Sequence, residues 1–273
     1  MKWRVVLYCL VGGLSLTMAA LGAGNFPWFW LSGILMAGAF VPVALFGPRT
    51  ALGQFGVIAP VLLIVTLLCT WSEVMVFFPQ YSRRVTQDLF GGMVMYGILA
   101  VVLALLTWLL RLSQPSEVPV PHRSIVGGSL MTLCSGLSYV LYYLVFGAIT
   151  YQFFTKDHYP EGPQTVARLG VWLFWGIQLA RGVLMTLAVL PVIFTLRMRR
   201  WHAAVVVGLL IWILGGLALL VVPNELMGGR QRLIHTVEIF TQNFPLGVTA
   251  VLLLRPRSKP IPAAVPAASS AAG

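Results

Sequence analysis

The feature that most constrains this chain is a series of long apolar runs, separated by short segments rich in Gly, Pro or charge. A helix needs about 20 mostly apolar residues to cross a bilayer. The eight expected spans are Arg4–Leu21, Trp28–Phe46, Val57–Phe78, Leu89–Leu110, Ser124–Phe153, Val166–Leu196, Ala203–Val222 and Leu233–Leu254. No strand pattern competes with these runs. We therefore expect an all-α polytopic membrane helix bundle of about eight transmembrane helices.

The small number of charged residues supports this class. Only 9% of the residues are charged and 59% are hydrophobic, whereas soluble domains carry about 25% charged residues. A net charge of +11 would suggest nucleic-acid binding in a soluble protein. Here most Lys and Arg flank the apolar runs, which is the pattern that orients membrane proteins. We expect the lipid bilayer as a partner, no nucleic acid, and room for homo-oligomer formation.

The distribution of basic residues predicts the orientation. If both termini share one side, eleven of the 18 Lys and Arg lie there, six lie opposite, and Arg181 lies within a span. Cytoplasmic loops carry the excess of basic residues, so we expect both termini in the cytoplasm and the protein in a bacterial inner (plasma) membrane. The first run also resembles a signal peptide, and cleavage there would leave seven spans. The Pro-, Ala- and Ser-rich tail, residues 255–273, is expected to be disordered.

Four short segments of the first half are echoed in the second half, in the same order. They are Leu10–Thr17 with Ile125–Thr132, Val41–Arg49 with Leu190–Arg197, Phe77–Gln80 with Val221–Asn224, and Leu109–Arg111 with Leu253–Arg255. Halves of four spans each would share one orientation, as in a parallel duplication. We expect halves at 1–114 and 115–254 of one transmembrane bundle (1–254), with chance similarity as the alternative.

The clear cases of charged residues inside the expected spans are Glu73, Arg181 and Glu238. At 1.5 Å per residue, each lies roughly 22–24 Å from the cytoplasmic end of its span. Such residues are costly in the bilayer, and they usually mark functional sites. Their common depth predicts one polar cluster in the outer half of the membrane.

Other polar side chains are spaced so that they join this cluster. Helical periodicity places a set of polar residues within one wedge of the eighth span: Arg232, His235, Glu238, Gln242 and Asn243. The predicted polar pocket comprises Glu73, Tyr139, Gln178, Arg181, Arg232, His235, Glu238 and Asn243. Two carboxylates and one guanidinium leave one negative charge uncompensated. A protonated carboxyl, a protonated His235 or a bound cation would balance it.

The segment from Pro223 to Phe244 resembles the C-terminal signature of a group of uncharacterised bacterial multi-pass membrane proteins. The residues that carry the resemblance are Pro223, Asn224, Met227, Arg232, His235, Glu238, Asn243 and Phe244, with Gln178 before "ARG" in the sixth span. Glu225 and Gly228 stand where prolines are expected. The resemblance covers about the last 110 residues and implies no function.

Three functions are compatible with this pattern. The preferred one is binding or proton-coupled transport of an unknown small solute or ion, in which Arg181 anchors the cluster and a carboxyl exchanges a proton. The second is a structural network that holds a scaffold or partner-binding protein together. The third is an intramembrane enzyme that uses His235 and Glu238 as base and orienting partner, or as metal ligands with Glu73. No cofactor or metal motif is recognised, and no two histidines face each other inside the spans as a haem would need, so we expect neither.

Overall fold

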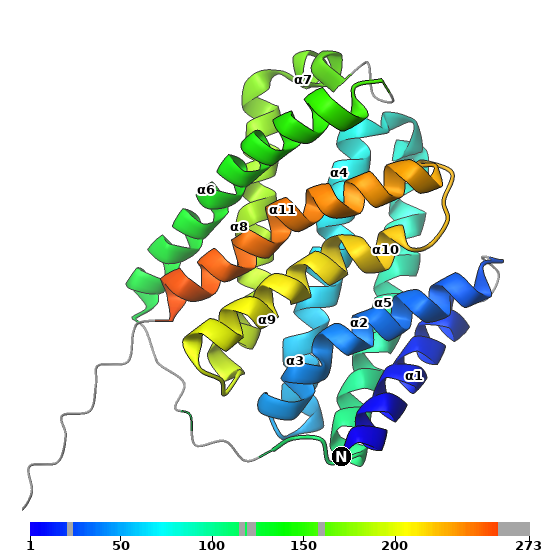
Figure 1. Ribbon diagram of the computed structural model, residues 1–273, viewed down its shortest axis with the longest axis vertical. Helices are drawn as coiled ribbons and strands as arrows, with labels where there is room; N and C mark the ends of the chain where they lie inside the picture. The colour runs from blue at the N-terminus through cyan, green and yellow to red at the C-terminus, as the bar shows by residue number, and fades with distance from the viewer. Residues whose placement is uncertain (21–23, 115–117, 119–123, 158–161, 256–273) are drawn as a thin grey trace, which may run out of the picture.

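The computed structural model describes residues 1–20, 24–114, 118, 124–157 and 162–255, and every regular element within them is a helix (Figure 1). The first half contains α1 (Lys2–Ala19), α2 (Phe26–Phe46), α3 (Ala51–Pro60), η1 (Val61–Cys69), α4 (Thr70–Phe77), η2 (Pro79–Arg84) and α5 (Val85–Leu109). The second half contains α6 (Ile125–Thr150), η3 (Tyr151–Thr155), α7 (Gly162–Leu169), α8 (Val171–Thr195), α9 (Arg200–Trp212), η4 (Ile213–Leu217), α10 (Ala218–Leu220) and α11 (Gly229–Leu254). The prediction of an all-α membrane bundle is confirmed.

Seven helices of the described residues are long and apolar enough to cross a membrane. Two of them, α3–η1–α4 and α9–η4–α10, pass through a π-helical segment without ending. The first expected span, Arg4–Leu21, forms α1, an 18-residue helix that is not among the seven. Lys2 and Arg4 in its first turn lower the apolar character of α1. The structure therefore shows a multi-pass membrane protein with seven such helices, and α1 beside them.

The expected sixth span, Val166–Leu196, is divided in the structure. Gly170 has φ +81°, a left-handed conformation that separates the short helix α7 from α8. Glycine adopts this conformation without the steric cost of a Cβ atom. The membrane-length helix is therefore α8 alone, with 25 residues, and Arg168 of α7 donates a hydrogen bond to the backbone oxygen of Val76 near the end of α4.

Both ends of the described chain lie at the same end of the bundle, the lower end in Figure 1. Arg4 in α1 donates a hydrogen bond to the backbone oxygen of Leu110, just after α5. The backbone N–H of Arg197, just after α8, donates to the oxygen of Phe46 at the end of α2. Arg255 closes the same end by donating to the backbone oxygens of Ile193, Leu196 and Met198. The predicted disordered tail lies outside the described residues, except for Arg255.

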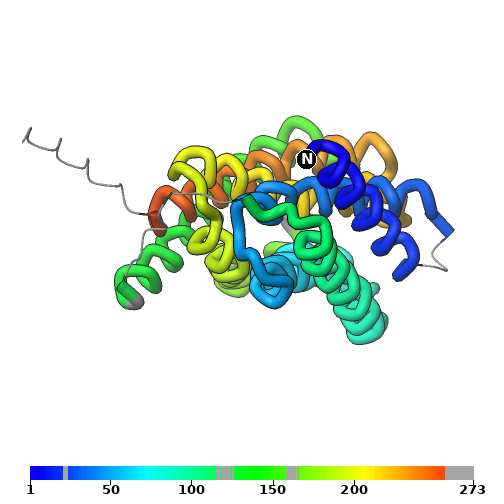
Figure 2. The backbone as a smooth tube through the Cα atoms, turned by 90° about the horizontal axis from the view of Figure 1, so that it is seen from below, coloured from blue at the N-terminus to red at the C-terminus, as the bar shows by residue number. Residues whose placement is uncertain are grey.

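The two halves pack alike. In the first, α1 contacts α2 and α5, and α3 contacts α5; in the second, α6 contacts α8 and α11, and α9 contacts α11. The contacts between the halves also correspond, since α8 packs on η1, α2 packs on η4, and the two π-helical segments contact each other. In Figure 2, α2, α9 and α11 lie on one side of the molecule, and α3 and α5 lie on the other. This pattern is what a parallel repeat requires, and the duplication itself stays a prediction.

In each half two glycines meet at a helix crossing, of α1 with α2 and of α6 with α8. The second half has a further one, where a Cβ atom on Gly247 of α11 would lie 2.6 Å from the Cα of Gly208 in α9. A Cβ atom on Gly33 of α2 would lie 2.7 Å from the Cα of Gly13 in α1. A Cβ atom on Gly182 of α8 would lie 2.7 Å from the backbone oxygen of Gly136 in α6. Small residues allow such close contact of membrane helices. Gly33 and Gly182 are each followed, nine residues later, by a proline inside the same helix.

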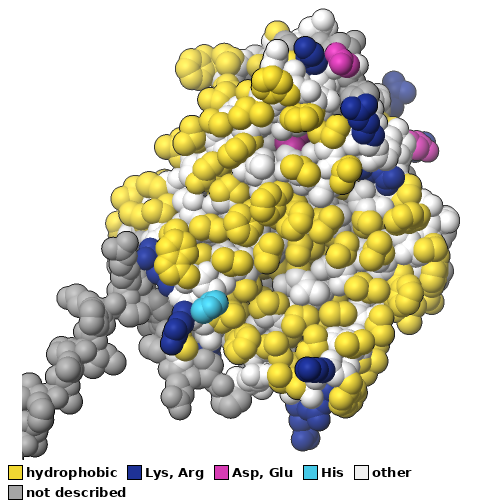
Figure 3. Space-filling model, viewed as in Figure 1, with side chains coloured by type: hydrophobic (Ala, Val, Ile, Leu, Met, Phe, Trp, Pro, Cys, Tyr) yellow, Lys and Arg dark blue, Asp and Glu magenta, His cyan; other side chains and the backbone are white. Residues whose placement is uncertain are grey.

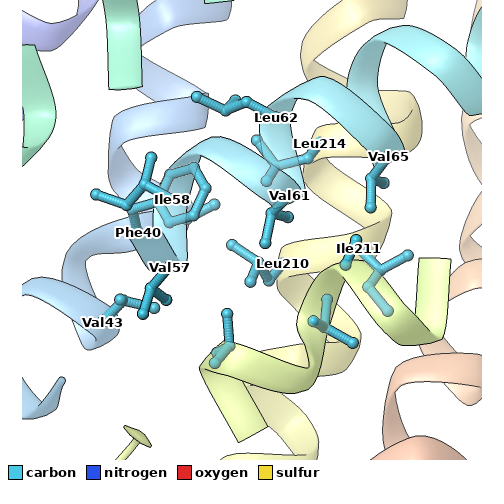
Figure 4. Close-up of a cluster of buried hydrophobic side chains, with 14 of the residues drawn as sticks. Phe40, Val43, Val57, Ile58, Val61, Leu62, Val65, Leu210, Ile211 and Leu214 are labelled. Carbon is cyan, nitrogen blue, oxygen red and sulfur yellow. The ribbon is translucent and has the colours of Figure 1, made fainter. Parts of the chain in front are cut away.

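The main hydrophobic core lies where the halves meet. Figure 4 shows buried side chains of α2, α3 and η1 from the first half against those of α9 and η4 from the second; the labelled residues are Phe40, Val43, Val57, Ile58, Val61, Leu62, Val65, Leu210, Ile211 and Leu214. The face drawn in Figure 3 is also apolar over its middle, while Lys and Arg gather toward its two ends. An apolar belt between two basic ends is the surface expected of a protein in a bilayer.

Candidate functional site

An ion pair joins the two halves in the interior. Arg181 of α8 donates from Nη2 to Oε2 of Glu73 in α4 over 2.7 Å. Its Nη1 atom donates to Oε1 of Gln178, one turn earlier, over 2.8 Å. The guanidinium carbon lies 5.7 Å from the ring centre of Tyr139 in α6, within the range of a cation–π contact. Three helices therefore place three of the predicted residues around the guanidinium of a fourth, Arg181.

A second pair of ionisable side chains lies on α11. His235 Nδ1 is 2.9 Å from Oε2 of Glu238, three residues later. Gln242 donates from Nε2 to the other carboxylate oxygen over 3.4 Å. His235 and Glu238 are about one-fifth exposed, at 23% and 17%, whereas Gln242 is buried. The carboxylate is thus held from both sides on one helix face while part of it stays accessible.

Both pairs contribute to the wall of one cavity of about 430 Å³. Glu73, His235 and Glu238 line it, together with side chains of α6, η3, α8, η4 and α10. It lies toward the end of the bundle opposite the described chain ends, because it is lined by the end of α4, the beginning of α8 and the loop before α11. The cavity therefore joins α4 of the first half to the helices of the second.

Periodicity and charge did not reveal the aromatic wall of this cavity. Phe174 and Trp175 of α8 contact each other edge to face, with ring centres 5.2 Å apart. Tyr143 of α6 contacts both rings, and Phe77 of α4 contacts Phe174. All four residues line the cavity. Aromatic residues are common throughout the chain, at 12%, so their number alone did not single out these four.

The remaining predicted residues lie behind the cavity or apart from it. Arg181, Gln178 and Tyr139 are buried and form a layer behind Glu73. Asn243 faces α9, where its Nδ2 atom lies 3.5 Å from the backbone oxygen of Ile211. Arg232, in the first turn of α11, has two buried guanidinium nitrogens without a hydrogen-bond partner among the described residues. The expected single wedge on the last span therefore divides, because Gln242 and Asn243 point about 100° apart.

The loop before α11 is part of the same site. Asn224 accepts hydrogen bonds at Oδ1 from the backbone N–H groups of Leu226 and Met227, over 3.0 and 3.1 Å. This turn places all three side chains in the cavity wall. Four of the eight residues that carry the resemblance in this segment therefore line one cavity: Asn224, Met227, His235 and Glu238.

The charges of the site decide which chemistry it can perform. Within the part of the chain that the structure describes, no three His, Cys, Asp or Glu side chains are grouped to hold a metal ion. The accessible groups are two carboxylates and one imidazole, and imidazole is the side chain that most readily exchanges protons near neutral pH. The site can hold a polar group against Glu238 and an apolar body against the rings, and it can exchange a proton.

The fold and the cavity define the class: an integral, multi-pass helical membrane protein with a mostly apolar, aromatic-walled cavity that also contains two carboxylates and an imidazole. Comparisons with protein-family models, curated proteins and solved structures find no match, so the family resemblance stays an expectation.

Proposed function

We propose that the protein binds a small solute in this cavity and moves it across the membrane, with the His235–Glu238 pair exchanging a proton. The observation that carries the proposal is that two pairs of ionisable side chains contribute to the wall of one cavity of about 430 Å³. A network that only joined helices would gain nothing from such a space, because cavities lower stability. Interhelical polar contacts in membranes also contribute little, about 0.6 kcal/mol each.

The first experiment follows thermal unfolding of the purified full chain in detergent, from about pH 5 to about pH 8. We expect the wild type to show a pH-dependent step that is lost in Glu238→Gln, while that variant stays folded, because the amide still occupies the place between His235 and Gln242. A purely structural network predicts that Glu238→Gln loses folded protein and that no separate pH step exists. That outcome would favour the scaffold alternative.

The second candidate function is an intramembrane enzyme, favoured by the distance of 2.9 Å between His235 Nδ1 and Glu238. A carboxylate that holds one imidazole nitrogen orients the ring for general base catalysis at the other. Thr70 and Tyr143, which carry hydroxyl groups, line the same cavity. If His235→Gln abolished turnover of a bound compound while its affinity stayed unchanged, catalysis would replace transport as the proposed function.

For the location we propose a bacterial inner (plasma) membrane with both termini in the cytoplasm. The support is the cluster of basic residues at the end of the bundle where both ends of the described chain lie, among them Lys2, Arg4, Arg197 and Arg199. The cavity would then lie in the outer half of the bilayer. Reporter fusions after the C-terminus should be active in the cytoplasm, and activity on the other side of the membrane would reverse the orientation.

A further inference from the structure

None of the ionisable side chains described in the cavity wall carries a permanent positive charge. Among the described residues they are Glu73, His235, Glu238 and the tyrosines Tyr143 and Tyr151, with no Lys or Arg. Arg181, behind the wall, is already paired with Glu73 and Gln178. With a neutral imidazole, Glu238 is therefore the one carboxylate without a cationic partner. An anionic ligand would be repelled there, whereas a cation would restore neutrality at low dielectric.

The groups that act on His235 come from several helices. On its own helix these are Glu238 and, one turn earlier, Arg232. From α4 comes Glu73, from α6 Tyr143, and from α8 Arg181, which pairs with Glu73. The segments η4 and α10 contain no ionisable residue, and those of α9, Arg200 and His202, do not line the cavity. Among these kinds of group, imidazole is the one whose ordinary pKa lies near neutral pH.

The rest of the wall selects the kind of cation. A small metal ion takes about six oxygen ligands, and the described residues offer no group of three His, Cys, Asp or Glu side chains. Instead the wall is mostly apolar and includes Phe77, Phe174, Trp175 and Tyr143. Aromatic rings attract an organic cation through their negative faces and also bury its apolar part.

We propose that the ligand of this cavity is an organic monocation with an apolar body, whose charge replaces a proton on the His235–Glu238 pair. This inference rests on the proposed binding function. The cation lies against Glu238, and the proton held by His235 leaves to solvent, so the net charge of the cavity stays constant. The reverse step returns the proton and releases the cation. The protein would thereby exchange an organic cation for a proton.

The test uses three probes of similar shape and different charge: tetraphenylphosphonium, tetraphenylborate and neutral triphenylphosphine oxide. Their binding is measured to the full chain in lipid nanodiscs, with empty nanodiscs subtracted. We expect saturable binding of tetraphenylphosphonium alone. Because proton and cation compete, its Kd should weaken by up to about tenfold per pH unit as the pH falls below the point where His235 takes up its proton, and it should level off above that point. Binding in weak buffer should release up to one proton per cation.

Two variants on one helix test whether the probe binds in this cavity. Gly147 of α6 lines the cavity, and a Cβ atom there would lie 3.8 Å from Glu238 Oε1, at ordinary contact distance. Gly147→Ala should keep the fold and weaken tetraphenylphosphonium binding several-fold. Gly128→Ala on the same helix is the matched control, because its Cβ atom would meet nothing within 4 Å. Glu238→Gln should abolish the pH dependence as well as weaken binding.

The possible results separate the two proposals. If tetraphenylborate or the neutral probe binds with an affinity that Gly147→Ala lowers, and the phosphonium does not, solute binding stands and the cation inference falls. If the phosphonium binds with a Kd independent of pH, proton exchange is refuted. If no probe binds with an affinity that depends on Gly147, neither proposal survives.

Discussion

Ser32 of α2 and Arg181 of α8 occupy corresponding positions in the two halves, each directly before the glycine of a helix crossing. Both side chains are buried and both reach into the other half. Ser32 donates a hydrogen bond to the backbone oxygen of Ala218 in α10, and Arg181 donates to Glu73 in α4. At this position the first half is joined to the second by the hydrogen bond of a serine, whereas the second half is joined to the first by a buried ion pair.

This difference bears on the purpose of the charges. Since α1, α2 and α5 pack together as α6, α8 and α11 do, the arrangement does not depend on a charge before the crossing glycine. An ion pair in the bilayer carries a desolvation cost that a serine does not. Of the two corresponding positions, only the one next to the cavity carries a charge and its desolvation cost. That asymmetry favours a functional role for Glu73, Arg181 and the cavity over a purely structural one.

The largest effect is expected from Arg181→Ser, which gives the second half the residue of the first. Glu73 would remain as a mostly buried charge without its partner, which costs about 3–5 kcal/mol in comparable buried pairs. Gln178 would also lose its hydrogen bond. Unfolding by heat or by titration with denaturing detergent should show this loss of stability directly.

The control for that prediction removes both charges together. Arg181→Ser combined with Glu73→Leu leaves no unpaired charge, so most of the stability should return. Recovery would show that the second half, like the first, can pack without the ion pair. A double variant no more stable than Arg181→Ser alone would mean that the pair itself holds the halves together.

Much of this site follows from the sequence because apolar runs fix depth in the bilayer. Counting residues along each run places Glu73, Arg181 and Glu238 at one level, and the structure joins the first two and puts Glu238 in the same cavity wall. The direction in which each side chain points is harder to predict from the sequence. Gln242 and Asn243 are neighbours in the sequence, but one bonds to Glu238 and the other lies against α9.

Two features of the fold were also beyond the sequence. Gly170 ends a helix in the middle of an apolar run, and an isolated glycine in such a run does not reveal its φ angle. Sequence similarity pairs Gly13 with Gly128, whereas the helix crossings pair Gly13 with Gly136. Glycines are frequent in membrane helices, so a match of glycines in the sequence does not show which of them occupy similar places at the helix crossings.

An intermediate effect is expected where the halves should respond equally. Gly33→Ala and Gly182→Ala each place a Cβ atom 2.7 Å from backbone atoms of the partner helix, so the helices must separate. Overpacking of this kind costs about 1–3 kcal/mol. Both variants should lower the unfolding temperature by similar amounts, and parallel thermal denaturation of the two proteins measures this.

Matched controls come from the same two helices. A Cβ atom on Gly38 of α2 or Gly176 of α8 would meet nothing within 4 Å. Gly38→Ala and Gly176→Ala should therefore leave stability unchanged or raise it by up to about 1 kcal/mol, since alanine favours the helix. If only one crossing glycine were sensitive, the correspondence between the halves would fail at this point.

The smallest effect is expected from Ser32→Ala, which removes only the hydrogen bond to Ala218. Such a bond between membrane helices contributes about 0.6 kcal/mol, and alanine fits where serine was. The change in unfolding free energy should thus be several times smaller than for Arg181→Ser, measured under the same conditions. A loss as large as that of Arg181→Ser would show that polar contacts before the crossing glycines hold both halves equally, and the ion pair could no longer be distinguished from scaffolding. A small loss of stability would maintain the difference between the halves. The hydrogen bond of Ser32 would then be nearly dispensable, while Arg181 carries a charge that packing does not require.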